Sequence, residues 1–132
     1  MSKTTLYDVR ADGKAHVMIA GRFAGADTGA PTYPIANPPG WTASRVSAGR
    51  YRLTFADQYA AFICATVTLE ANTPADIDGF TAQTSTYTAG ASPVLDIYVY
   101  DGAAAGARAV HDLSANEFVN FVCIFRNTTV AQ

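Results

Sequence analysis

The sequence predicts an all-β protein, an antiparallel β-sandwich of jelly-roll type. Apolar and polar residues alternate with a period of two almost wherever a period can be read. The apolar runs are short and separated by turn-forming residues, and neither a convincing helix nor a βαβ rhythm is present. Seven or eight such strands are typical of a sandwich. With 132 residues the chain has the size of one domain, so residues 1–132 are expected to form a single sandwich.

The first two predicted strands, residues 4–10 and 14–22, form a hairpin. Asp12-Gly13 lies between them, and this dipeptide is a strong signal for a type I′ turn, which needs positive φ at both central residues. Pairing across this turn sets Leu6 opposite Ile19, with one face of the hairpin directed toward a core.

Residues 23–40 are rich in Gly, Ala, Pro, Asn and Thr. Proline fixes φ and removes a donor from a β-ladder, so this stretch predicts an ordered surface loop or an extended arm rather than a strand. Trp41 follows at once and is expected to pack the loop onto the sheet.

Residues 49–55 give the clearest strand, because Tyr51, Leu53 and Phe55 alternate with polar residues. A short turn at residues 56–58 leads into a long, largely apolar strand over residues 59–70. Its expected core contributors are Phe62, Ile63, Val67 and Leu69.

The second half of the chain supplies three further predicted strands. Residues 80–88 form a polar, Thr-rich strand after a turn at residues 72–78, and residues 93–101 form a strand buried on both faces apart from Asp96. Residues 101–116 are a Gly- and Ala-rich connection in which a single helical turn remains an alternative. The final strand, residues 117–128, is so apolar that both of its faces are expected to be buried.

Composition narrows the class of function. Charged residues reach only 15%, whereas about 25% is usual, so part of the surface is expected to be covered by other protein. A net charge of −2 with scattered cations gives no basis for nucleic-acid binding. No apolar segment is long enough for a signal peptide or a membrane span, so synthesis in a cytoplasm is expected.

The reactive side chains form no recognisable catalytic, cofactor or metal site. Cys64 and Cys123 are expected to be buried thiols, with a disulfide between neighbouring strands as the alternative. His16 and His111 lie far apart in the sequence and lack the close ligand spacing of a metal centre. The Asp76-Ile-Asp78-Gly79 run begins like a calcium loop, but residue 87, the closing position, is Tyr rather than Glu. No cofactor, no metal and no enzymatic activity are therefore predicted.

Seven tyrosines leave three interpretations open. Those near predicted strands or the long loop can belong to the core, to a subunit interface, where Tyr is enriched, or to an aromatic surface that stacks on sugars. They are Tyr7, Tyr33, Tyr51, Tyr59, Tyr98 and Tyr100.

Two segments carry a resemblance to a known group. Gly49-Arg-Tyr-Arg-Leu-Thr-Phe55, with the turn and long strand after it, resembles the central hairpin of small virion proteins of tailed bacteriophages. The stretch from Asp112 to Thr128 resembles the C-terminal strand of the same group, and both segments are similar to trimeric jelly rolls of the tumour-necrosis-factor-like architecture. They cover roughly a third of the chain.

The resemblance implies a structural virion protein on the capsid surface, either a decoration (cement) protein that stabilises the lattice or a head spike. It further implies a homotrimer whose last strand lies near the threefold axis, with the major capsid protein as partner and no membrane. The alternative is a receptor- or glycan-binding tip domain of a tail or head fibre. A third hypothesis, a small hydrolase, requires His111 and an acidic side chain to line one cleft.

Overall fold

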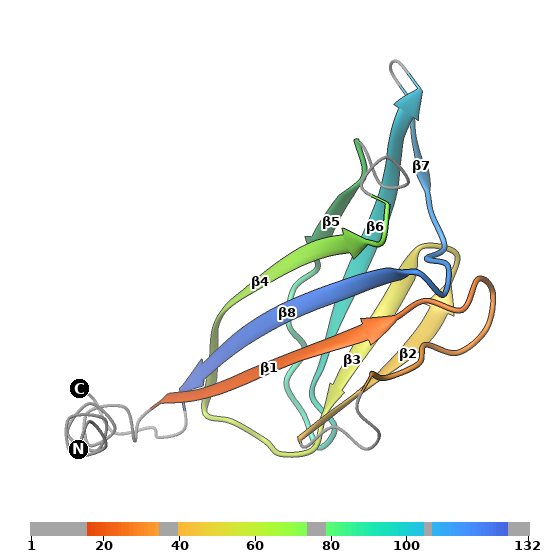
Figure 1. Ribbon diagram of the computed structural model, residues 1–132. Helices are drawn as coiled ribbons and strands as arrows, with labels where there is room; N and C mark the ends of the chain where they lie inside the picture. The colour runs from red at the N-terminus through yellow and green to blue at the C-terminus, as the bar shows by residue number, and fades with distance from the viewer. Residues whose placement is uncertain (1–15, 35–39, 74–78, 105–106, 127–132) are drawn as a thin grey trace, which may run out of the picture.

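The computed structural model describes residues 16–34, 40–73, 79–104 and 107–126 of the chain. These residues contain no helix (Figure 1). They form eight strands: β1 (His16–Ala24), β2 (Trp41–Ser47), β3 (Arg50–Phe55), β4 (Ala61–Ala71), β5 (Thr81–Thr84), β6 (Val94–Ala104), β7 (Ala107–Val110) and β8 (Glu117–Arg126).

The strands form two antiparallel sheets that pack face to face (Figure 1). The first sheet has the order β1-β8-β4, and the second has the order β2-β3-β6-β5. Strand β7 also pairs with β6. The pairing of β3 with β6 reaches Tyr98, which lies opposite Arg50, and the pairing of β7 begins at Tyr100, which lies opposite Val110. The predicted all-β sandwich is therefore confirmed, whereas its jelly-roll connectivity stays a prediction.

The core lies between the sheets and follows the period of two. On β3, Tyr51, Leu53 and Phe55 are buried, as the sequence predicts. Because successive side chains of a strand point to opposite faces, β6 and β8 each contribute one face to the core. Their buried apolar residues are Leu95, Ile97 and Val99 on β6 and Val119, Phe121, Cys123 and Phe125 on β8.

Trp41 anchors the Pro-rich segment, as expected. Its ring makes edge contacts with Tyr33 from that segment, at 5.5 Å between centroids, and with Phe121 of β8, at 4.8 Å. The Tyr33 hydroxyl donates to the backbone oxygen of Ala43 and accepts from its N–H. Gly21 leaves room for the indole, since a Cβ there would stand 2.3 Å from Trp41. Residues 25–34 therefore pack as an ordered loop, which begins after β1 ends at Ala24.

The expectation that both faces of the last strand are buried is wrong. Strand β8 alternates strictly between buried and half-buried residues, because it is the middle strand of a three-stranded sheet with only one face against the second sheet. Its outward residues are Phe118, Asn120, Val122, Ile124 and Arg126.

Two further burial expectations are corrected. Ile63 is 47% exposed, because a bulge between Phe62 and Cys64 shifts the register of β4 against β8 at this point. Asp96, expected as the polar exception in a buried strand, is itself only 5% exposed, since two arginines of β3 enclose its carboxylate.

Several element boundaries also differ from the prediction. The connection 101–116 contains the end of β6 and all of β7, and the polar strand expected over residues 80–88 is limited to β5 with an isolated bridge at Thr88. Gly102 suggested a loop but lies within β6, where a Cβ would stand 2.0 Å from the carbonyl oxygen of Gly79. Strand β2 was not predicted. The hairpin strand 4–10, its Asp12-Gly13 turn and the acidic pair of residues 76 and 78 lie outside the described residues.

Candidate functional surfaces

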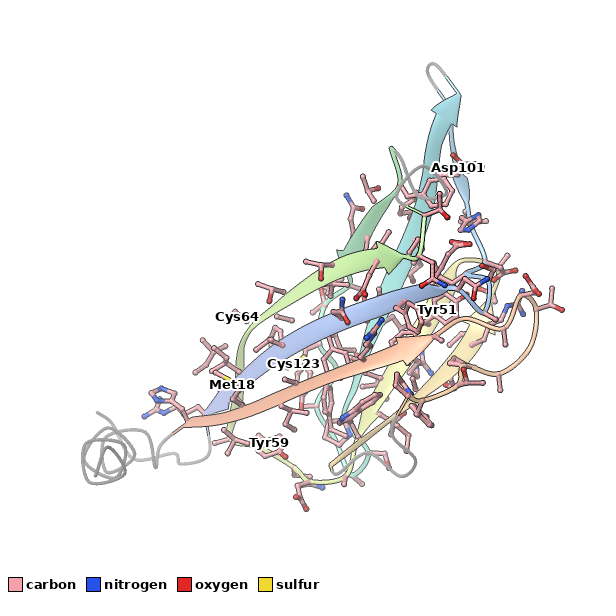
Figure 2. All side chains as sticks on the ribbon, in the orientation of Figure 1. Met18, Tyr51, Tyr59, Cys64, Asp101 and Cys123 are labelled. Carbon is pink, nitrogen blue, oxygen red and sulfur yellow. The ribbon has the colours of Figure 1, made fainter. Side chains whose placement is uncertain are left out.

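The outer face of the first sheet carries a continuous apolar area. The register sets Met18 of β1, Ile124 of β8 and Cys64 of β4 in one row across the three strands. Ala20, Val122 and Thr66 form the next row. Met18 is 67% exposed, and Figure 2 labels it and Cys64 on the two strands that flank β8. We call this area, with Ile63 at the bulge, the apolar face: Met18, Ala20, Ile63, Cys64, Val122 and Ile124.

The polar end of the same sheet is held by a small network. Arg22 Nη2 lies 2.9 Å from Glu70 Oε1, and Asn120 Nδ2 donates to Glu70 Oε2 at 2.9 Å. The Arg22 guanidinium lies 4.0 Å from the ring centroid of Phe118. A shallow depression of about 200 Å³ beside Asn120 is lined by Thr66 and Thr68 as well. Polar contacts thus border the apolar face on this side.

The two cysteines point to opposite faces of the first sheet. Ala65, not Cys64, lies opposite Cys123 in the register, so the thiol of Cys64 points outward and that of Cys123 points into the core. Both are free. Burial raises the pKa of Cys123 to about 12, so this thiol stays protonated at neutral pH and packs as a small apolar group. The prediction of a buried thiol is confirmed for Cys123 and is wrong for Cys64, which is exposed.

The outer face of the second sheet carries a carboxylate held by two arginines. Asp96 Oδ2 accepts from Nε of Arg50 at 2.8 Å and from Nη2 of Arg52 at 3.0 Å, while its Oδ1 accepts from Nε of Arg52 at 2.7 Å. Nη2 of Arg50 also donates to Oδ2. The hydrogen bond from Arg52, with those from Arg50, holds the pKa of Asp96 below its ordinary value despite its burial.

Two tyrosines continue this outer face along β6. The rings of Tyr98 and Tyr100 are nearly parallel, at 11°, with centroids 6.5 Å apart. Tyr98 lies between Arg50 on one neighbouring strand and Gln83 on the other, and the Arg50 guanidinium lies 5.4 Å from its ring centroid. The core interpretation is confirmed for Tyr51, whereas Tyr98 and Tyr100 are half-buried on a surface, where the interface and the sugar-stacking interpretations both stay predictions.

His111 does meet a carboxylate. Its Nε2 lies 2.9 Å from Glu117 Oε2, and Glu117 Oε1 accepts from the backbone N–H of Ser114 at 3.3 Å. A hydrolytic triad needs a hydroxyl or thiol on the other ring nitrogen. No such hydrogen bond occurs in the described part of the chain. His16 lies at the far end of the first sheet, and within the described ranges no three His, Cys, Asp or Glu side chains gather in a way that could hold a metal ion.

A second ion pair fixes the loop that carries His111. Asp112 accepts from Nε and Nη2 of Arg45, both at 2.8 Å, and from the backbone N–H of Gly49 at 3.0 Å. The hydrogen bond from Arg45 is the main cause of the lowered pKa of Asp112. The buried Tyr51 hydroxyl accepts from the N–H of Leu113 at 2.7 Å. These contacts anchor the β7–β8 connection to β2 and β3. No local sequence pattern predicts them, because the partners are more than 60 residues apart.

No family model matches the sequence, and no curated protein or solved structure shows significant similarity to it. No helix that could cross a membrane occurs in the described ranges.

Proposed function

We propose that the chain is a structural assembly protein, a capsid decoration (cement) protein that forms a homotrimer on a virion and binds the major capsid protein. The observation that carries this proposal is the apolar face of the first sheet. The virion and the trimer come from the resemblance of residues 49–70 and 112–128 to small virion proteins, and the apolar face supplies a physical reason for association.

The outer face of a two-sheet sandwich is expected to be polar where it meets water. Here Met18 and Ile63 expose 67% and 47% of their surface, and Ile124 lies between Met18 and Cys64 on the middle strand. Contiguous apolar patches of this kind mark contact sites in soluble proteins, whereas single exposed apolar residues do not.

A second copy of the chain is the occupant that this face fits best. The face carries no charge within its apolar rows, so three copies that meet around a threefold axis bury these rows without leaving an unpaired ion. The Arg22–Glu70 pair at its border offers a cation and an anion together, and each can meet an opposite charge on a neighbouring copy around a threefold axis. The overall charge fraction of 15% agrees with a chain that covers part of its surface by assembly.

Binding to capsids is the direct test of the virion role. Capsids that lack the protein are mixed with the purified chain, sedimented, and challenged by heat. We expect co-sedimentation at a fixed ratio and a higher temperature of capsid disruption. If the protein stays in the supernatant and the disruption temperature does not change, the decoration role is wrong.

One observation favours the second candidate, a receptor- or glycan-binding tip domain. The outer face of the second sheet combines half-buried tyrosines with arginines and Gln83, and such a mixture of aromatic and hydrogen-bonding groups is typical of sugar-binding surfaces. This face lies on the opposite side of the sandwich from the apolar face, so one chain can use both.

A further inference from the structure

The outer face of the second sheet places cations, aromatic rings and an amide in adjacent rows. One row across the strands is Arg50, Tyr98 and Gln83, and the neighbouring row sets Arg52 beside Asp96. Tyr100 follows Tyr98 on the same face of β6. All these residues lie in strands, so hydrogen bonds of the sheet fix their backbone positions.

The charges of this face do not balance. Arg50 and Arg52 both direct Nε and Nη2 to the single carboxylate of Asp96, which leaves one positive charge in excess. Neither Nη1 atom has a hydrogen-bond partner among the described residues. The two arginine side chains remain 34% and 35% exposed, so solvent and ligands can reach them, although Asp96 between them is buried.

We propose that this face binds a saccharide that carries a carboxylate. The Nη1 groups of Arg50 and Arg52, which Asp96 does not engage, supply donors for the carboxylate, because guanidinium and carboxylate form strong charge-assisted hydrogen bonds. The Tyr98 and Tyr100 rings supply the apolar contact for the sugar ring, and Gln83 supplies donors and an acceptor for hydroxyl groups.

The geometry favours a sugar over an acidic peptide. Recognition of an extended peptide by a sheet uses a free strand edge. Here the arginines and tyrosines project from β3 and β6, which are interior strands of the sheet. A rigid ring with a single carboxylate can lie on the tyrosines with its charge at the arginines, without any strand pairing.

Asp96 acts as a positioning residue in this account. It holds both guanidiniums in place before the ligand arrives, so that less side-chain entropy is lost on binding. The inference rests on the second candidate function and names its ligand class. It does not depend on the assembly proposal.

Titration calorimetry with matched probes tests the proposal. Sialyllactose is compared with lactose, and trigalacturonic acid with its methyl ester, each against the full chain at low and at physiological salt. We expect both acidic probes to bind about tenfold or more tightly than their neutral partners, with affinity falling as salt rises. If the neutral sugars bind equally well, the face binds glycans but the acidic specificity is wrong. If no probe binds, both the inference and the glycan-binding candidate fail.

Variants locate the site. Arg52→Gln is expected to lower the affinity for the acidic probes about tenfold, and Tyr98→Ala to lower it further than Tyr98→Phe, which keeps the ring. Thr42→Ala, on edge strand β2 opposite Thr54 and two strands from Tyr98, is the control and is expected to bind like the unchanged protein. Urea unfolding shows that each variant is folded. Equal binding by Arg52→Gln and Thr42→Ala would contradict the site. If hexaglutamate binds the unchanged protein as tightly as the acidic saccharides, the ligand class is wrong.

Discussion

At the scale of single residues, the buried carboxylate of Asp96 is held by hydrogen bonds from Arg50 and Arg52 on the neighbouring strand β3. Alternation identifies the strand that carries Asp96 but not its partners, because pairing with β3 joins residues more than 40 positions apart. Arg50 and Arg52, which read as solvent-facing residues of a half-buried strand, turn out to share one buried carboxylate. A buried charge is tolerated only with such partners.

Replacement of Asp96 tests this arrangement. Asp96→Asn keeps the shape but removes the charge, so we expect a loss of about 2 kcal/mol in the free energy of unfolding at pH 7, measured from urea midpoints. The folded-state pKa of Asp96 is lowered, so its stabilisation is present above the ordinary Asp pKa and is lost as pH falls through the lower value. The difference between the two proteins should therefore shrink in acid. A difference that is constant with pH would contradict the ion pair.

The cysteines give a second residue-scale prediction. Exposed Cys64 is expected to react with a maleimide in a monomeric variant such as Met18→Lys, whereas Cys123 reacts only after unfolding, because its pKa is about 12 and it is buried. In the unchanged protein, self-association through the apolar face should protect Cys64 as well. Mass spectrometry of the labelled peptides distinguishes the two thiols. Rapid labelling of Cys64 in the unchanged protein would contradict burial of this face.

At the scale of the element, the period of two predicts where strands lie, but it does not predict which of their faces are buried or how the strands pair. Strand β3 is as expected, and β8 begins at Glu117, as predicted. Both faces of β8 carry apolar residues, so hydropathy alone could not separate the face that packs in the core from the outer face of the sheet. The bulge that exposes Ile63 depends on the register of β4 against β8, which local sequence does not determine. Strand β2, with its polar and small residues, offered no clear alternation.

The two faces of β8 are expected to respond differently to truncation. Phe121 is 3% exposed and contacts Trp41, so Phe121→Ala should reduce the free energy of unfolding by about 3–5 kcal/mol. Phe118→Ala, on the outward face of the same strand, is the matched control and should lose clearly less. Urea midpoints of the two variants provide the comparison. Equal losses would mean that the assigned inward and outward faces of β8 are wrong.

At the scale of the whole molecule, the sandwich presents two chemically distinct outer faces. The first sheet is apolar around Met18 and Ile124, and the second is cationic and aromatic around Arg50 and Tyr98. The low charge fraction predicted that some surface is covered by protein, but only the pairing of β1, β8 and β4 brings the exposed apolar residues of separate segments together. Composition thus predicts an association but not the surface that would mediate it.

Association through the apolar face is tested by the solution mass of the protein. Light scattering after size-exclusion chromatography is applied to the unchanged chain, to Met18→Lys, and to Val46→Lys, which changes an exposed valine of the other sheet, 41% exposed, and serves as the control. We predict a mass of three times 13.9 kDa for the unchanged chain and for Val46→Lys, and a single-chain mass for Met18→Lys. A mass of 13.9 kDa for the unchanged protein at micromolar concentration would mean that the apolar face does not join copies of the chain.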